Sequence, residues 1–269
     1  MQRLTVLFAV ALSACAHLPA TPTEIPLRVM TYNIRSGNND LAATVQAIRA
    51  SSPDLVALQE VDVHWAARSG FIDQATTLGE QLGMEMRFAR IYQLAPARAG
   101  DPPREFGVAM LSKFPVKYFR NHMITRHSTQ DTAAAPALAP GFLEARVDVR
   151  GTSVRVFDTH LDYRAESGVR RQQVSEMLEH IDDDRTTPTL LFGDLNAPPD
   201  APEIQPLFTR LRDAWPASSG AGLTDPADVP VKRIDYVLVT KHFRVRSASV
   251  PATLASDHRP VVMDLVLTP

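Results

Sequence analysis

The chain has one cysteine, Cys15, and no apolar run long enough to cross a bilayer as a helix. A single thiol can form neither an intramolecular disulfide nor a thiolate metal site, so both are excluded. An excess of charge is also missing: 28 Lys and Arg face 30 Asp and Glu, which leaves a formal net charge of -2. A nearly neutral chain does not coat nucleic acid by bulk electrostatics, although a local phosphate site stays open.

The N-terminus contains the features of an export signal. Arg3 supplies a basic start, and a short apolar run over residues 4–12 follows it. Leu12-Ser13-Ala14-Cys15 resembles the lipobox of bacterial lipoproteins, which implies cleavage before Cys15 and a lipid carried by that cysteine. The alternative is an ordinary signal that is cut elsewhere, with Cys15 incidental. We therefore predict an exported lipoprotein, held at an outer membrane or at the periplasmic face of a membrane.

The rest of the chain divides into a tether and one domain. Pro19, Pro22 and Pro26 favour an extended backbone, so residues 15–26 are interpreted as a tether that follows a signal peptide over residues 1–14. No break rich in proline, glycine and serine divides residues 27–269, which predicts a single domain. The sequence favours a monomer.

Strand and helix patterns alternate along this domain. Val45 and Ile48 share one helical face with Leu41, with Asn39 or Asp40 as a cap, and a second amphipathic helix includes Val174 and Met177. An Ala- and Pro-rich stretch over residues 127–141 predicts a surface loop. The alternation predicts an α/β layered fold. Apolar runs predict strands at 27–33, 55–58, 108–111, 143–149, 154–157, 189–192, 234–239 and 261–267.

Polar residues recur where the predicted strands end, which is where ligands collect in layered α/β folds. Carboxylate and amide oxygens are the donors that Mg²⁺ and Mn²⁺ prefer, and imidazoles add proton donors. This combination suits the metal-assisted cleavage of a phosphoester. The residues concerned are Asn33, Glu60, Asp158, His160, Asp162, Asp194, Asn196, Asp235, Asp257 and His258.

The order of these motifs resembles the endonuclease/exonuclease/phosphatase superfamily, which includes DNases, neutral sphingomyelinases and inositol-polyphosphate phosphatases. The motifs are Thr31-Tyr32-Asn33, Leu58-Gln59-Glu60-Val61, Gly107 to Ser112, Thr159-His160-Leu161, Gly193-Asp194-Leu195-Asn196, Arg233-Ile234-Asp235-Tyr236 and Ser256-Asp257-His258-Arg259-Pro260. Each motif alone is weak, but their number and order are specific. The resemblance implies a four-layer α/β/β/α sandwich with two mixed sheets, as in DNases.

The resemblance also implies a role for each residue. Asn33 and Glu60 would bind Mg²⁺ or Mn²⁺, with Asp257 sharing the metal. Asp194 would orient or deprotonate the attacking water, while Asn196 would hold the phosphate. His160 would donate a hydrogen bond to the phosphoryl oxygen, and His258, oriented by Asp235, would contact the phosphate or act as acid or base.

Taken singly, each residue also has a purely structural interpretation. Asp194 and Asn196 could cap a helix or form a turn, Asp235 could pair with Arg233 or another basic group, and His160 could be a hydrogen-bonded core histidine. The ordered set favours the site, because burying so many uncompensated charges costs several kcal/mol each in order of magnitude. Among residues near the site, Arg164, Arg170 and Arg171 are interpreted as a solvated helix face, and His122, Arg126 and His127 as the approach to a loop, with a substrate rim as the alternative.

The substrate is the least determined part. Arg35 stands where AP endonucleases carry an acidic residue, and Pro140-Gly141 replaces the Arg-Gly of many relatives. We predict a hydrolase of phosphodiesters or phosphomonoesters that acts outside the cytoplasm on a small or lipid-linked substrate; nucleic acid is not favoured. The alternatives are a secreted metal-dependent nuclease and, in another class, a catalytically silent ligand-binding lipoprotein.

Overall fold

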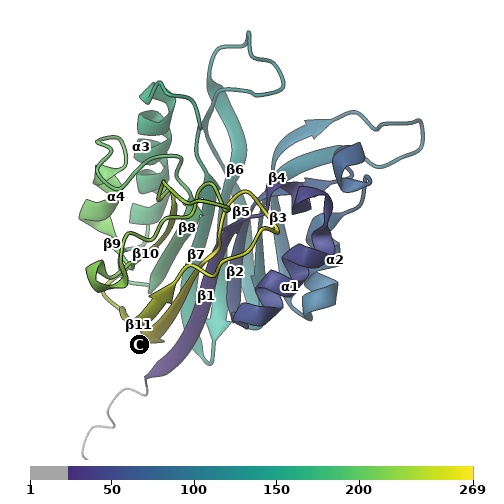
Figure 1. The fold of residues 1–269 in the computed structure, drawn as a ribbon. Helices are drawn as coiled ribbons and strands as arrows, with labels where there is room; N and C mark the ends of the chain where they lie inside the picture. The colour runs from purple at the N-terminus through teal and green to yellow at the C-terminus, as the bar shows by residue number, and fades with distance from the viewer. Residues whose placement is uncertain (1–23, 269) are drawn as a thin grey trace, which may run out of the picture.

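Two six-stranded sheets form the centre of the molecule (Figure 1). The computed structural model describes residues 24–268; the predicted signal and Cys15 lie outside the described residues. The first sheet has the order β11-β12-β1-β2-β4-β3. Its strands are β1 (Ile25–Asn33), β2 (Leu55–Val63), β3 (Glu85–Leu94), β4 (Arg104–Ser112), β11 (Phe243–Ser249) and β12 (Val261–Leu267).

The second sheet has the order β5-β6-β7-β8-β10-β9. Both sheets are mixed: β1 runs parallel to β2 and β7 parallel to β8, while the other pairs are antiparallel. The predicted sandwich with two mixed sheets is therefore confirmed. The strands of the second sheet are β5 (Val116–Arg126), β6 (Ala137–Val149), β7 (Thr152–His160), β8 (Thr189–Asp194), β9 (Arg212–Asp213) and β10 (Asp235–Val239).

Helices cover the outer face of each sheet (Figure 1). Val45 and Ile48 of α1 (Leu41–Ser51) and Leu78 of α2 (Gln74–Leu82) pack on the first sheet. Met177 of α3 (Gly168–Asp182) and Leu207 of α4 (Gln205–Arg210) pack on the second. Short 3-10 turns lie at η1 (Arg35–Asn39), η2 (Ala67–Ser69) and η3 (Ala217–Ser219). Within residues 24–268, no helix is long and apolar enough to cross a membrane.

The main core lies between the sheets, which explains why the central strands are apolar on both faces. In β1, Leu27 and Val29 face the opposite sheet, while Met30 and Tyr32 face the helices. A strand buried on both sides carries few polar positions, and an interior one such as Thr31 has a partner, Gln59, because an unpaired buried polar group costs free energy. Polar side chains in such strands are therefore informative about the site.

Local signals set the helix starts as the sequence predicts. Asp40 accepts a hydrogen bond from the backbone N of Ala43 at 3.0 Å and caps α1, which confirms one of the two predicted caps. Asp73 caps α2 in the same way, with 2.9 Å to the backbone N of Thr76. The helix α2 itself was not predicted from the sequence.

The structure corrects several predicted boundaries. β1 begins at Ile25, inside the predicted tether, and β6 begins at Ala137, so the end of the predicted loop at 127–141 is strand. The strands β3, β5, β9 and β11 were missed. β3 and β5 are partly exposed and carry charged residues at several positions, and these charges hide the apolar pattern.

Candidate active site

The pairing register of β7, β8 and β10 brings together the ends of these three strands of the second sheet. His160 at the end of β7 lies opposite Asp194 at the end of β8, and Asp194 lies opposite Asp235 at the start of β10. His160 Nε2 is 3.6 Å from Asp194 Oδ2. The backbone pairing alone therefore places an imidazole and two carboxylates side by side at one edge of the sheet.

The first sheet supplies Asn33 from the end of β1. Its buried side-chain Nδ2 donates to Glu60 Oε1 at 3.1 Å and to Asp194 Oδ2 at 3.0 Å. Its Oδ1 accepts a hydrogen bond from the backbone N of Arg35. A single amide therefore joins two carboxylates that come from different sheets.

Glu60 occupies an irregular point in β2. The pairing of β2 with β4 shifts register between Leu58 and Val61, and Glu60 has a φ of 56°. Positive φ is uncommon for a residue other than glycine, and bulges near active sites turn a side chain away from the regular pleat. Here the carboxylate of Glu60 lines a cavity together with His160.

Asn196 follows Asp194 in a tight turn. Its backbone N donates to Asp194 Oδ1 at 2.9 Å, and its φ is 49°. Its side-chain Nδ2 donates to the backbone O of Leu161 at 3.0 Å, next to His160. The turn that a purely structural interpretation would predict is present, and it also fixes the orientation of the Asp194 carboxylate.

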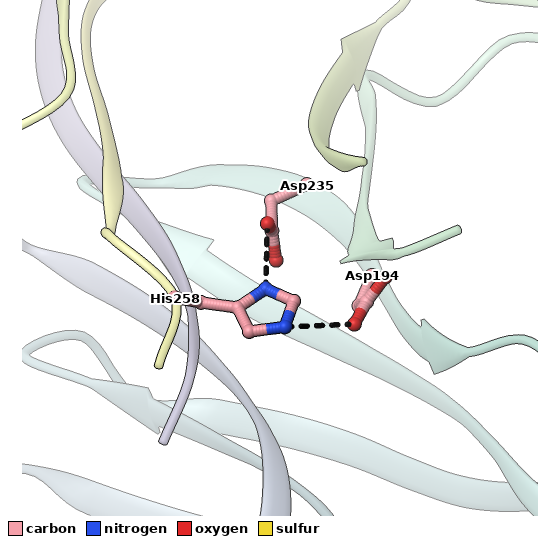
Figure 2. A group of neighbouring side chains, drawn as sticks. All are labelled: Asp194, Asp235 and His258. Carbon is pink, nitrogen blue, oxygen red and sulfur yellow. Dashed lines mark hydrogen bonds and ion pairs between the residues drawn. The ribbon is translucent and has the colours of Figure 1, made fainter. Parts of the chain in front are cut away.

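His258 lies between two carboxylates (Figure 2). Its Nδ1 is 2.9 Å from Asp235 Oδ2, and its Nε2 is 3.8 Å from Asp194 Oδ2. Asp235 Oδ2 also accepts a hydrogen bond from Thr224 Oγ1 at 2.5 Å. A carboxylate on Nδ1 fixes the ring orientation and directs Nε2 toward Asp194. The alternative pairing of Asp235 with Arg233 is wrong, because Arg233 binds Asp213.

Burial and mutual repulsion shape the charges of this cluster. Burial, together with the neighbouring carboxylate of Asp235, raises the pKa of Asp194. Burial opposes the charged form of His258, but Asp235, Asp194 and Asp257 outweigh it and raise the pKa of His258 to about 10. The site is therefore rich in negative charge, with a protonated imidazole between the acids.

The donor set fits a hard divalent cation. Asp194, Asp235 and His258 are the one group of three acidic or imidazole residues within residues 24–268 whose ligand atoms all lie within 4.8 Å of one another. His258 and Asp235 already bond to each other, which makes this trio a hydrogen-bonded pair that faces a carboxylate. Two further carboxylates, Glu60 and Asp194, both accept from the Nδ2 of Asn33, and a cation beside them would balance their charge.

Asp257 lies slightly apart from this position. Its side chain is 38% exposed, and its Oδ2 is 3.3 Å from Arg35 Nε. The neighbouring Ser256 Oγ donates to the backbone O of Asn33 at 2.7 Å, which ties the segment before β12 to the end of β1. The structure thus brings together seven of the eight predicted residues directly and places Asp257 beside them, paired with an arginine.

Three neighbouring predictions need correction. Arg170 is not part of a solvated face: it is buried, and its Nη2 is 2.7 Å from Glu203 Oε1. His122 is not on a rim, because it is buried in β5 and bonded to Glu144. Asp158 does not follow β7 but lies inside it, where Gln59 Nε2 of the other sheet donates to it at 2.7 Å. Each partner comes from a distant part of the chain.

Sequence reasoning also missed residues that support the site. Thr224 has no motif of its own, yet its hydroxyl binds Asp235. Asp225 Oδ1 lies 3.9 Å from His258 Nε2. Arg126 was singled out from the sequence at the approach to the loop, with a substrate rim as the alternative. It is buried, lines a cavity together with His160, and donates to the backbone oxygens of Pro140, Gly141 and His160.

Comparison with known proteins gives a consistent result. The family model described as Endonuclease/Exonuclease/phosphatase family matches residues 30–258. No match was found among curated proteins. Among solved structures, an endonuclease/exonuclease/phosphatase from Beutenbergia cavernae is 26% identical to this chain, with a TM-score of 0.69. The match covers 90% of this chain and 72% of that protein.

Two further structures share the fold at lower identity. The catalytic domain of human nocturnin is 22% identical, with 91% of this chain and 94% of its own covered and a TM-score of 0.69. The mannosyl-6-phosphatase of Bacteroides thetaiotaomicron is 16% identical, with a TM-score of 0.64. That match covers 90% of this chain and 100% of the phosphatase. At these identities the likeness concerns the fold.

Proposed function

The chain belongs to the endonuclease/exonuclease/phosphatase family, and from this premise we propose that it is a divalent-metal-dependent hydrolase of phosphoesters that acts outside the cytoplasm. The observation that carries the proposal is the position of Asp194. Its Oδ2 accepts a hydrogen bond from Asn33 and lies near the Nε2 atoms of both His160 and His258. A carboxylate between an oxygen-rich cation position and two imidazoles suits water attack on a phosphate.

The residues of the chain divide the work as follows. Asp194, oriented by Asn33 and by the backbone N of Asn196, accepts a proton from the attacking water. His160 and His258 each present an Nε2 beside Asp194, where they donate to oxygens that gain charge in the transition state. Asp235 holds the ring of His258 in place through Nδ1.

A cation would be held by Asn33 and Glu60, with Asp257 next to them. When bound, Mg²⁺ or Mn²⁺ supplies positive charge to the non-bridging phosphate oxygens. Asn196, whose backbone N donates to Asp194 and whose side-chain Nδ2 donates to the backbone O of Leu161, is proposed to hold the phosphate. These assignments follow the family motifs.

The direct test uses the purified full-length chain with bis(p-nitrophenyl) phosphate and p-nitrophenyl phosphate. We expect turnover with Mg²⁺ or Mn²⁺, loss of turnover in EDTA, and recovery when excess metal is added back. Turnover that persists in EDTA would contradict the metal requirement. Absence of turnover on both esters under all conditions would contradict hydrolysis and favour a ligand-binding lipoprotein.

A small or lipid-linked substrate is proposed in preference to nucleic acid. The net charge of -2 gives no broad attraction for a polyanion. Plasmid DNA and phospholipids in the same assay separate the possibilities. Cleavage of plasmid DNA at rates above those on the small esters would reverse this preference and make the chain a nuclease.

The location is proposed from the N-terminal sequence alone. Cys15, in a segment that resembles a lipobox, would carry the lipid and hold the enzyme on the membrane. Expression in a bacterial host followed by membrane sedimentation tests this. We expect the unchanged chain to sediment with membranes and Cys15→Ala to stay in the supernatant; a variant that sediments equally well would refute the anchor.

A further inference from the structure

A cavity of about 210 Å³ opens next to the active site. Glu60 and His160 line it, so it is continuous with the position proposed for the phosphate. The other walls come from strands β3 and β4 and from the segments that follow β5 and β7. The residues of these other walls have no role in the proposed mechanism.

One wall of the cavity is aromatic. Tyr92 of β3 and Phe106 of β4 line it, with ring centroids 6.1 Å apart in a stacked arrangement. The buried ring of Trp65 backs both, at 6.4 Å from Tyr92 and 5.7 Å from Phe106. The hydroxyl of Tyr92 accepts a hydrogen bond from the backbone N of Thr129, which ties the loop after β5 to this wall.

A further ring, that of Tyr163, lines the same cavity from the segment after β7. Tyr163 is 63% exposed, and the guanidinium of Arg164 lies over its ring at 5.2 Å from the centroid. Arg164 in turn donates to the backbone oxygens of His127 and Ser128. The ring is thus supported by a fixed arginine, although it buries little of its own surface in the protein.

We propose that this cavity is a specificity subsite that binds one compact, planar aromatic group attached to the phosphoryl group of the substrate. The inference rests on the proposed function, because the phosphoryl group must sit beside Glu60 and His160. Aromatic side chains stack on planar rings and favour them over flexible chains of similar size. The cavity is smaller than the roughly 300 Å³ at which pockets for drug-sized ligands begin, which suits a single ring system and excludes a duplex.

The size of the expected effect follows from ring stacking. Stacking one ring on an aromatic side chain contributes roughly 1–3 kcal/mol, of which 1.4 kcal/mol corresponds to a tenfold change in affinity. A ligand with a ring should therefore bind at least about fivefold more tightly than the same ligand without one.

Phosphonates that differ only in the organic group provide the test, because their P–C bond resists hydrolysis. Titration calorimetry of the full-length chain with Mg²⁺ would compare phenylphosphonate, butylphosphonate and methylphosphonate. We expect phenylphosphonate to bind at least about fivefold more tightly than the other two. Equal binding of all three would overturn the subsite and leave the phosphate site intact, and equal binding of the phenyl and butyl compounds would overturn the preference for a planar ring.

Variants locate the preference. Tyr163→Ala removes an exposed ring and Phe106→Leu replaces the wall ring with an aliphatic side chain; both should reduce the preference for phenylphosphonate to about threefold or less and leave methylphosphonate binding unchanged. Tyr118→Ala removes a tyrosine that is exposed outside the cavity and should keep the full preference. An unchanged preference in Tyr163→Ala and Phe106→Leu would overturn the proposal. If no phosphonate binds and no ester turns over, the proposed function fails together with the subsite.

Discussion

Two buried histidine–carboxylate pairs in this protein have nearly equal contact distances, through Nδ1 of His258 and Nε2 of His122, and different surroundings. His258 lies 2.9 Å from Asp235 at the strand ends, and His122 lies 2.8 Å from Glu144 within the second sheet. Arg155 Nε donates to Glu144 at 2.9 Å, so the inner pair has a fixed positive partner. The outer pair faces a second carboxylate, Asp194, at 3.8 Å.

The comparison shows that a buried pair alone does not indicate function. Arg155 also donates to the backbone oxygens of His180, Ile181 and Asp184, so all three nitrogens of its guanidinium have acceptors within the protein. Burial acts to raise the pKa of Glu144, but His122 and Arg155 outweigh it and lower that pKa. The outer cluster instead keeps a surplus of negative charge beside a cavity, and the pKa of Asp194 is raised. That surplus is what a cation or substrate can use.

Among substitutions in the two clusters, Asp194→Asn should cause the largest loss of turnover. The substitution keeps the shape and removes the proton acceptor, so turnover of bis(p-nitrophenyl) phosphate should fall by at least ~100-fold. The melting temperature should stay the same or rise, because one of two neighbouring buried carboxylates loses its charge. Kinetics and thermal unfolding of the same preparation measure both; near-normal turnover would remove Asp194 from the mechanism.

A smaller loss of turnover is expected for Asp235→Asn. The amide oxygen can still accept from His258 Nδ1, but the charge that holds the imidazole is lost, so kcat should fall roughly 10- to 100-fold. KM should change little, because Asp235 lies behind the imidazole and does not face the substrate position. A change confined to KM would contradict the assigned positioning role.

Breaking the inner pair of His122 and Glu144 should lower the unfolding free energy and leave turnover unchanged. Glu144→Gln leaves Arg155 buried without its carboxylate, and breaking a buried pair in this way costs about 3–5 kcal/mol of unfolding free energy. Denaturant unfolding measures the loss, and turnover per folded molecule should equal that of the unchanged chain. A fall in turnover comparable to that of Asp235→Asn would erase the distinction between the clusters.

The smallest effect concerns the pH dependence of that stability. Because the pKa of Glu144 is lowered in the folded state, its contribution is present above the ordinary glutamate pKa of about 4.3 and is lost as pH falls through the lowered value. The difference in unfolding free energy between the unchanged chain and Glu144→Gln should therefore be constant near neutral pH and shrink in acid. A difference that grows in acid would contradict the assigned sign.

Much of the fold could be predicted because its central strands are buried on both faces. Residues 27–33 and 189–192 are mostly apolar and largely buried, and the site residues Asn33 and Asp194 stand at the ends of β1 and β8. The exposed strands escaped prediction for the opposite reason. β5 mixes charged, polar and aromatic residues without a regular alternation, and its strand form depends on pairing with β6.

The sequence by itself determined which residue types stand at the strand ends and in which order, and this order identified the family fold and the candidate residues. Only the tertiary structure decided which charges are neutralised, because the partners come from distant segments: Glu203 for Arg170, and Arg155 for Glu144. The same holds for the cavity, whose aromatic wall forms where β3 and β4 meet the active-site edge. Hydrophobic burial follows from the local apolar pattern, whereas charge compensation depends on distances between side chains that only the folded chain brings together.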